Sequence, residues 1–221
     1  MFCDAALIRK GSFVDKRIVG IMNIQDAARY LGVNQQHIHH WQEHEFLPGS
    51  GLETEDLDAF CHCFQLQKPI GDVLTDVPWA LMRGGFIRDI DGSSVDEVLE
   101  NALAAMELHP QANREMILNA LKERERISST GVGHGIAFPH VSSPSSLDLP
   151  YSSICLVQLK RAIPYFSFDQ KEVNLLFVLL VPQTQAHLKI LQQLAKNVRN
   201  PVFRETIAAA DGIQAVIDAL E

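Results

Sequence analysis

The sequence predicts a layered α/β domain that follows a small helical unit. Two short apolar runs, residues 154–159 and 173–181, are rich in β-branched and aliphatic residues and are bounded by polar or turn-forming residues, as buried strands are. Helical patterns precede these runs and follow them. Helices and strands that alternate along a chain favour a layered α/β architecture. The region before residue 66 shows three short helical patterns instead.

Residues 22–65 are predicted to form the helical unit. Apolar residues recur at helical spacing over residues 24–31, 35–44 and 52–64, and Gly32 ends the first of these helices. Two short helices that meet at a glycine-containing turn are the helix-turn-helix pattern. The sequence therefore predicts a small helix-turn-helix module in this part of the chain.

The remaining boundaries follow from changes in composition. Residues 1–21 match neither unit and are predicted to be a flexible arm, and residues 66–78 hold turn-formers and weak periodicity, which predicts a linker. The α/β domain is expected over residues 79–221. Its first helix begins at a capping-box pattern, Ser94 with Glu97, and further helices are predicted up to about Arg126 and at three sites near the end of the chain (residues 186–198, 201–209 and 213–220).

Composition and charge narrow the class of protein. The chain has 221 residues, of which 47% are hydrophobic, and a net charge of −8. This charge argues against a general nucleic-acid binder, because phosphates are neutralised by excess Lys and Arg. No apolar run is long enough to span a bilayer and no secretory signal is evident, so we expect a cytoplasmic protein without a membrane segment. The four cysteines are then expected to be reduced thiols.

One segment carries the chemistry. Residues 124–140, RERISSTGVGHGIAFPH, follow a helix, contain glycines at alternate positions (Gly131, Gly133 and Gly135), and end in a short apolar strand that delivers Pro139 and His140. Glycines spaced in this way let backbone amides converge on an anion. A neutral imidazole is a competent nucleophile near neutral pH, and Ser129 and Thr130 offer donors to phosphoryl oxygens. On residue chemistry alone, a glycine-rich surface turn that ends in an ordinary histidine remains the alternative.

The segment STGVGHGIAFPH resembles the active-site signature of the mannitol/fructose-class enzyme IIA domains of the bacterial phosphotransferase system. The register also matches Leu121, Arg124 and Glu125, and a later block, VNLLFVLLVPQTQAHLKILQQLAK, matches the family's second motif. The resemblance covers about residues 79–221. It implies a mixed sheet flanked by helices, and phosphorylation of His140 by a phosphohistidine donor such as HPr or its nitrogen-branch relative.

The resemblance also assigns roles to other residues. It implies that His187 is the second active-site histidine, which orients or stabilises the phosphoryl group without accepting it. Residues expected to support the phosphate are Arg124, Ser129, Thr130, Gly131, Gly133 and Gly135. No metal and no cofactor are expected. The family often places a small residue and then Arg or Lys after the histidine, whereas this chain continues with residues 141–144, VSSP, so a basic docking residue is missing.

The helical unit resembles the excisionase/MerR-like helix-turn-helix in its pattern but not in its charge. Residues 22–65 contain one basic residue, Arg29, and seven acidic ones, a net charge of −6. Recognition helices normally offer Arg and Lys to phosphates. Sequence-specific DNA binding and a protein-interaction or dimerisation role therefore both stay open. A cluster of histidines (His37, His39, His40 and His44) with Cys61-His62-Cys63 is interpreted as a solvated face, because it lacks the ligand spacing of a zinc site.

Taken together, these features predict a phosphohistidine carrier of the nitrogen-regulatory enzyme IIA kind, with a downstream regulatory protein as its second partner. Two alternatives remain. One is a sugar-specific fructose- or mannitol-type component that works with separate IIB and IIC chains. The other is a DNA-binding regulator that is controlled by phosphorylation of its enzyme IIA domain. Whether the carrier counts as an enzyme in its own right, beyond its part in phosphoryl transfer through His140, is left open.

Overall fold

A computed structural model describes residues 23–31, 33, 35–43, 45–63, 77–149 and 151–220. The chain divides into two compact units, Met1–Gly71 and Asp72–Glu221. The arm predicted over residues 1–21 and nearly all of the predicted linker lie outside the described residues. Within the described part, no helix is long and apolar enough to cross a membrane.

The described residues of the first unit form three helices, α1 (Ile24–Leu31), α2 (Gln35–Glu43) and α3 (Thr54–Cys63), close to the positions that the sequence predicts. Their apolar faces meet in a small core, in which the rings of Trp41 and Phe60 lie 4.7 Å apart between centroids. Burial of these two aromatic side chains holds α2 against α3.

The second unit is built on a five-stranded mixed sheet with the order β1-β4-β5-β3-β2. The strands are β1 (Phe86–Ile90), β2 (Gly131–Gly133), β3 (Ile136–Ala137), β4 (Ser153–Ile163) and β5 (Val173–Leu180). The central pair β4 and β5 is antiparallel, whereas β1 pairs parallel to β4 and β3 pairs parallel to β5. The predicted mixed sheet is therefore confirmed.

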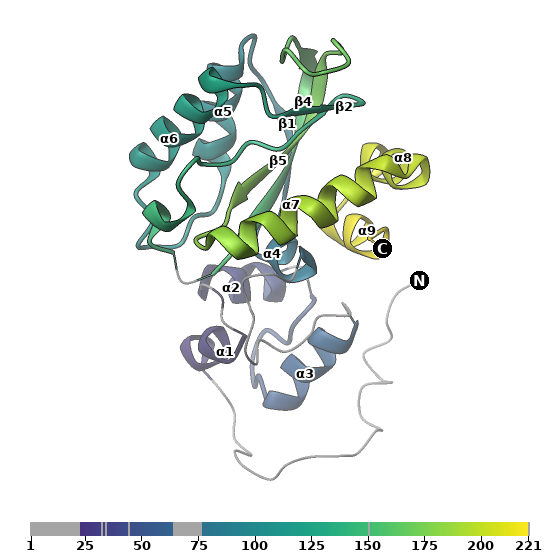
Figure 1. Ribbon diagram of the computed structural model, residues 1–221. Coiled ribbons are helices and arrows are strands. Elements are labelled where there is room, and N and C mark those ends of the chain that lie inside the picture. Colours follow the sequence, from purple (N-terminus) through teal and green to yellow (C-terminus); the bar gives the residue numbers. More distant parts are fainter. Residues whose placement is uncertain are drawn as a thin grey trace. The chain divides into compact units, whose positions relative to one another are not determined.

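Helices flank this sheet (Figure 1). α5 (Val95–Ala105) and α6 (Arg114–Ile127) lie next to each other, and α7 (Thr184–Arg199), α8 (Pro201–Ala209) and α9 (Ile213–Asp218) form a second group. α4 (Val77–Gly84) packs against β4, and a short 3-10 helix, η1, spans Pro144–Leu147.

The cap of α5 matches the sequence prediction in its first half only. The Ser94 hydroxyl accepts from the Glu97 amide, but the Glu97 carboxylate accepts from the amide and hydroxyl of Ser93 and not from Ser94.

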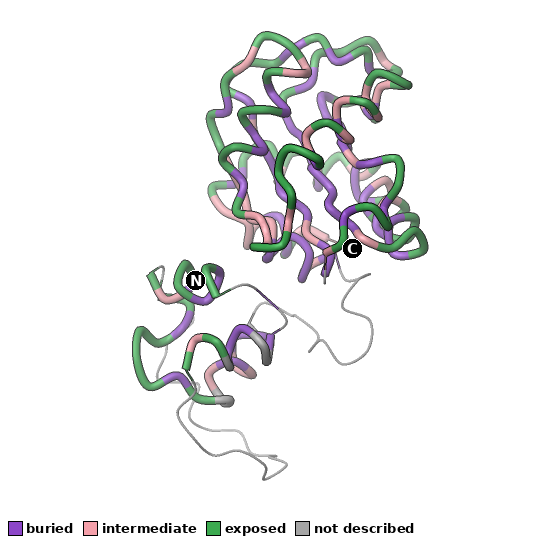
Figure 2. Tube along the Cα trace, turned by 90° about the vertical axis from the view of Figure 1, so that its left-hand side faces the viewer, coloured by how far each residue is buried: buried purple, intermediate pink, exposed green. Residues whose placement is uncertain are grey.

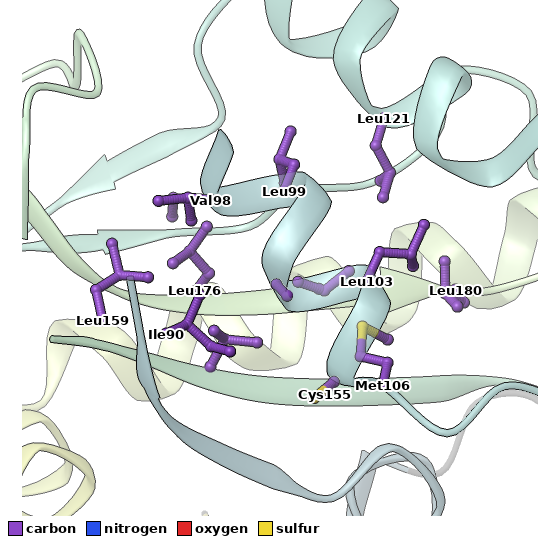
Figure 3. Close-up of a cluster of buried hydrophobic side chains, with 14 of the residues drawn as sticks. Ile90, Val98, Leu99, Leu103, Met106, Leu121, Cys155, Leu159, Leu176 and Leu180 are labelled. Carbon is purple, nitrogen blue, oxygen red and sulfur yellow. The ribbon is translucent and has the colours of Figure 1, made fainter. Parts of the chain in front are cut away.

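The core explains why the two long strands read as continuous apolar runs. Alternate residues of β4 and β5 belong to one core cluster with residues of α5 and α6, among them Cys155, Val157, Leu176 and Val178. Figure 3 labels Cys155 and Leu176 in this cluster. The residues between them, such as Phe177, are also buried. Buried positions therefore follow one another over residues 154–157 of β4 and 175–180 of β5, whereas residues 160–162 and Asn174 are exposed. Buried segments run through the middle of the second unit (Figure 2). A sheet covered on both faces selects apolar residues at every position.

Strand β1 was missed by the sequence prediction. Its residues are FIRDI, with Arg88 and Asp89 exposed, so it shows neither an apolar run nor clean alternation. It lies at the edge of the sheet, where Asp89 adopts a left-handed φ of 59° and the register with β4 shifts. Charged side chains and irregular register are common at sheet edges because they discourage further strand pairing.

Candidate functional site

A tight hairpin positions the segment that ends at His140. β2 and β3 are joined by a turn in which His134 and Gly135 both have positive φ, 57° and 78°. Two consecutive left-handed residues match the right-handed twist of a two-residue hairpin. The amide of His134 donates to the Asp169 carboxylate at 2.8 Å, which ties the turn to the β4–β5 loop. The chain leaves β3 in a fixed direction toward His140.

The alternate glycines serve close packing in this structure. A Cβ at Gly131 would lie 2.7 Å from the Ser167 Cβ, and one at Gly133 would lie 3.2 Å from an Asp169 carboxylate oxygen. At Gly135 the neighbour would be Asn174, at 3.0 Å. These contacts give the glycine pattern a structural reason in addition to the phosphate contact that the sequence predicts, and that contact stays a prediction.

His140 is held at the end of the segment by both ring nitrogens. Its Nδ1 lies 2.7 Å from the carbonyl oxygen of Phe138, and its Nε2 lies 3.2 Å from the Nε of Arg124. A carbonyl can only accept and a guanidinium can only donate, so we assign the proton to Nδ1 and a lone pair to Nε2. The amide of Leu179 donates to the Pro139 carbonyl at 2.8 Å, which fastens the segment to β5.

The structure brings His187 to His140, as the resemblance implies. His187 lies in the first turn of α7, buried, and its ring centroid is 4.7 Å from that of His140. Burial lowers the pKa of His187 to about 4, with smaller contributions from the nearby His140 and Arg124. Burial also lowers the pKa of His140, and the Arg124 guanidinium adds to this while the bond to Phe138 opposes it. Both imidazoles are therefore neutral near pH 7.

Arg124 and its neighbours connect α6 to the hairpin. Arg124 also donates to the Ser128 carbonyl at 2.7 Å, so its guanidinium is held between this carbonyl and His140. Glu125 accepts from the amide and the hydroxyl of Thr130, both at 2.6 Å. Ser129 donates its hydroxyl to the Tyr165 carbonyl at 2.6 Å. The hydroxyls of Ser129 and Thr130 thus bond to the protein itself, in positions that brace the loop.

The arrangement is suited to receiving a phosphoryl group. A neutral imidazole supplies a nucleophilic lone pair at Nε2, and the adjacent guanidinium offers positive charge and N–H donors to phosphoryl oxygens. Phosphoryl transfer needs mainly such positioning and charge stabilisation. A buried neutral histidine beside it, His187, provides a further donor or acceptor.

The histidine cluster of the first unit departs from the predicted solvated face at one position. His39 and His40 are exposed, but His37 is buried and its ring lies 5.9 Å from that of Trp41. Apolar packing against the tryptophan explains this burial. His44 lies outside the described residues. Among the described residues, no group of three or more His, Cys, Asp or Glu side chains is placed to hold a metal ion.

Comparison with known families decides the membership of the chain. Residues 83–221 match the family described as phosphoenolpyruvate-dependent sugar phosphotransferase system, EIIA 2. The chain belongs to this EIIA family. Its match includes the whole site, from Arg124 to His187, and begins within α4.

Individual EIIA relatives agree. A nitrogen regulatory protein of Pseudomonas aeruginosa is 34% identical over 140 residues, which cover 62% of this chain and 88% of the relative. A fructose-specific EIIA component of the phosphotransferase system from Haloferax volcanii is 33% identical over 110 residues, or 49% of this chain and 70% of the relative. The crystal structure of the nitrogen regulatory protein IIA-Ntr from Neisseria meningitidis superposes with a TM-score of 0.55 at 25% identity, covering 62% and 92% of the two chains.

Two residues of this EIIA site were assigned no role by sequence reasoning. Glu125 fits the family signature, and its carboxylate accepts hydrogen bonds from the amide and the hydroxyl of Thr130. Tyr165 accepts the Ser129 hydroxyl with its backbone carbonyl, and its side chain is buried in the core. Spacing along the chain could not reveal Tyr165, because it reaches the site from a loop 36 residues away from Ser129.

We expect Gly131→Ser to destabilise the EIIA domain by about 1–3 kcal/mol, the usual cost of overpacking. The new Cβ would meet backbone and side-chain atoms of Ser167 at 2.7–2.9 Å. Urea denaturation measures the difference. Gly212→Ser is the matched control, because nothing lies within 4 Å of a Cβ there and serine is a good residue at this helix N-cap. Equal free energies of unfolding for the two variants would contradict this prediction, because they would show that Ser167 can move away from a Cβ at position 131.

His187 makes the stability of the EIIA domain depend on pH. Its pKa is about 4 in the folded protein and about 6.5 in an unfolded chain. The unfolded chain therefore binds more protons between these values, and the free energy of unfolding falls as the pH drops below about 6.5. His187→Gln is expected to lose less of this free energy between about pH 7 and pH 5 than the unsubstituted protein. Urea denaturation measures the free energy of unfolding at each pH. If this free energy changed with pH in the same way for both proteins, a buried, neutral His187 would be contradicted.

Proposed function

We propose that this protein is a phosphohistidine carrier of the nitrogen-regulatory enzyme IIA kind. It accepts a phosphoryl group on Nε2 of His140 from an HPr-type carrier and passes on the signal to a downstream regulatory protein in the cytoplasm. The proposal rests on the hydrogen bonds of the His140 ring. Its Nδ1 is hydrogen-bonded to the Phe138 carbonyl, and its Nε2 faces the Nε of Arg124. Membership of the EIIA family supports it.

The proposed transfer step balances without a further reactant. The Nε2 lone pair of His140 attacks the phosphorus of the donor's phosphohistidine, a P–N bond forms, and the donor's P–N bond breaks. The electron pair of the broken bond returns to the donor imidazole, whose other ring nitrogen carries a proton throughout, so that it leaves as a neutral ring. His140 keeps its Nδ1 proton and becomes a cationic ring, which the Phe138 carbonyl stabilises through its 2.7 Å hydrogen bond. Arg124 then moves its N–H donors from Nε2 to the phosphoryl oxygens.

His187 is proposed to assist this step without accepting the group. Because it is neutral near pH 7, it can donate one ring N–H to a phosphoryl oxygen without carrying a charge of its own. Its ring lies beside that of His140 and is fixed on α7.

The similarity to nitrogen regulatory proteins favours a regulatory function over a sugar-specific one. The relative from Pseudomonas aeruginosa aligns over 62% of the chain, whereas the fructose-specific component aligns over 49% at nearly the same identity. A sugar-specific component would pass its phosphoryl group to a IIB protein. Rapid transfer from phosphorylated His140 to a fructose- or mannitol-type IIB protein would favour that alternative.

Phosphoryl uptake tests the proposal directly. We expect the full chain to gain the mass of one phosphoryl group when it is incubated with phosphoenolpyruvate, enzyme I and an HPr-type carrier, and to lose it in acid. His140→Ala should gain none, because the nucleophile is absent. His187→Ala should still be labelled at His140 but should transfer more slowly by about tenfold or more, the usual cost of losing one hydrogen bond to a charged group. Full labelling of His140→Ala, read by intact mass, would refute the assignment.

For the first unit, we propose a module that resembles the helix-turn-helix and contacts protein, either a partner or a second copy. Its net charge of −6 over residues 22–65 is the observation behind this choice. Five of the nine residues of α2 are exposed, and none of these five is Lys or Arg (Gln35, Gln36, His39, His40 and Glu43). Such a helix gives DNA phosphates no counter-charge at neutral pH.

We therefore expect non-specific DNA affinity no tighter than about 10⁻⁴ M at physiological salt, the weak end of the usual range. Gel-shift titration at neutral pH measures this affinity. A salt-sensitive shift at micromolar protein would instead support the DNA-binding regulator. Deletion of residues 1–65 is expected to leave phosphoryl uptake at His140 largely unchanged.

A further inference from the structure

A chain of hydrogen bonds leads from the Glu125 carboxylate to the ring of His140. Both oxygens of Glu125 are occupied by Thr130, because Oε1 accepts from its amide and Oε2 accepts from its hydroxyl, each at 2.6 Å. The Thr130 carbonyl then accepts from the Phe138 amide at 3.0 Å. The Phe138 carbonyl is in turn the acceptor for the Nδ1 of His140 at 2.7 Å. This series of bonds, called the Glu125 chain below, joins a carboxylate on α6 to the imidazole.

The first link of the Glu125 chain is a strong one. An amide and a hydroxyl both donate to the same carboxyl group, and a carboxylate without a proton of its own satisfies both donors. Hydrogen bonds to an ionised acceptor are shorter and stronger than bonds between neutral groups. The two 2.6 Å distances agree with such bonds.

The surroundings of this link keep water away from it. Thr130 is buried and Glu125 is half-buried. The side chain of Tyr165 is buried beside them, and burial raises the pKa of Tyr165 well above its usual range, to which the negative charge of Glu125 adds. Hydrogen bonds in such an environment are strong, and a group that loses its partner there is destabilising. Thr130 is therefore held firmly in place.

The Phe138 carbonyl depends on this anchor on one of its two sides. After Phe138, the Pro139 carbonyl is fastened to the Leu179 amide of β5 at 2.8 Å. Before it, the Phe138 amide is bonded to Thr130, which directly precedes β2, a strand of three residues at the edge of the sheet. The end of a short edge strand opens easily. Glu125 closes this end by binding Thr130 from α6.

We infer that Glu125 is a positioning residue, which acts through Thr130 and the Phe138 carbonyl to keep the proton of the attacking imidazole on Nδ1. This inference rests on the proposed function and adds a residue that reaches His140 only through others. Its neighbour Arg124 faces Nε2 of the same ring. Consecutive residues of α6 thus fix both ring nitrogens, Arg124 directly and Glu125 through the hairpin.

The test compares Glu125→Gln with Glu123→Gln in the full chain. Glutamine keeps the length of the side chain, but its NH₂ group donates and cannot replace the second acceptor oxygen. Glu123→Gln is the matched control, because Glu123 is exposed, lies on the other side of Arg124 in the sequence, and undergoes the same change in charge. Thr130→Val removes the hydroxyl and leaves every charge in place, and Thr130→Ser keeps the hydroxyl.

Long-range ¹H–¹⁵N correlation spectra of the unphosphorylated protein measure the tautomer of His140. We expect Glu125→Gln and Thr130→Val to shift part of the neutral ring to the form with its proton on Nε2. Glu123→Gln and Thr130→Ser should keep the proton on Nδ1. The pKa of His140 should also be lower in the first two variants, because the bond to the Phe138 carbonyl opposes the lowering of this pKa by burial.

Rates of labelling measure the effect on transfer. Phosphoramidate is a small donor that reports on the reactivity of His140 alone, and a phosphorylated HPr-type carrier also requires docking. Glu125→Gln is expected to slow labelling by both donors by about tenfold, which corresponds to about 1.4 kcal/mol, and for the carrier mainly through kcat. Glu123→Gln should stay within about twofold of the unsubstituted protein, as most surface substitutions do.

Other results would overturn the inference in distinguishable ways. A tautomer and a His140 pKa in Glu125→Gln equal to those in Glu123→Gln would show that Glu125 only stabilises the fold. A shift of the tautomer in Glu125→Gln but not in Thr130→Val would mean that the carboxylate acts through space and not along the chain. Slower labelling by the carrier alone would place Glu125 in docking.

Urea denaturation verifies that each variant is folded, and Thr130→Val decides the inference by its tautomer if Glu125→Gln does not fold. Failure of the unsubstituted protein to be labelled on His140 by either donor would refute the proposed function itself. The tautomers of the unphosphorylated variants would still decide whether Glu125 positions the ring, so the two failures are distinguishable.

Discussion

The hydrogen bond between the Nδ1–H of His140 and the Phe138 carbonyl is the contact on which the rest of the site depends. Without it, the ring could rotate or carry its proton on Nε2, and no lone pair would face Arg124. Pro139 lies between the two residues and restricts the backbone, and its carbonyl is fastened to Leu179 on the central strand β5. The orientation of the imidazole is therefore set by the sheet.

Burial supplies the second requirement, a neutral ring. Nucleophilic attack needs a lone pair, and desolvation lowers the pKa of both His140 and His187. The Arg124 guanidinium acts in the same direction because a second positive charge beside it is unfavourable. Once a phosphoryl group arrives, the same guanidinium has an anion to neutralise. One arginine thus keeps the acceptor reactive before transfer and stabilises the product afterwards, and both effects follow from its fixed place between Ser128 and His140.

The sequence predicted the parts of this structure that leave a local pattern. The buried strands β4 and β5 are continuous apolar runs, and the signature around His140, with the later motif around His187, placed two histidines together that are 47 positions apart in the chain. The edge strand β1 left no such pattern because its charged residues face solvent. The role of the glycines and the contribution of Tyr165 depend on a loop that folds back from a distant position, which no local spacing encodes.

The tautomer of His140 is the most direct test of this account, and long-range ¹H–¹⁵N correlation spectra of the imidazole rings at neutral pH measure it. The predicted result is a neutral ring with its proton on Nδ1, followed by attachment of phosphorus to Nε2 when the protein is phosphorylated. His140→Ala identifies the signals. An imidazolium ring at neutral pH, a proton on Nε2, or phosphorus on Nδ1 would contradict the geometry on which the proposed transfer rests.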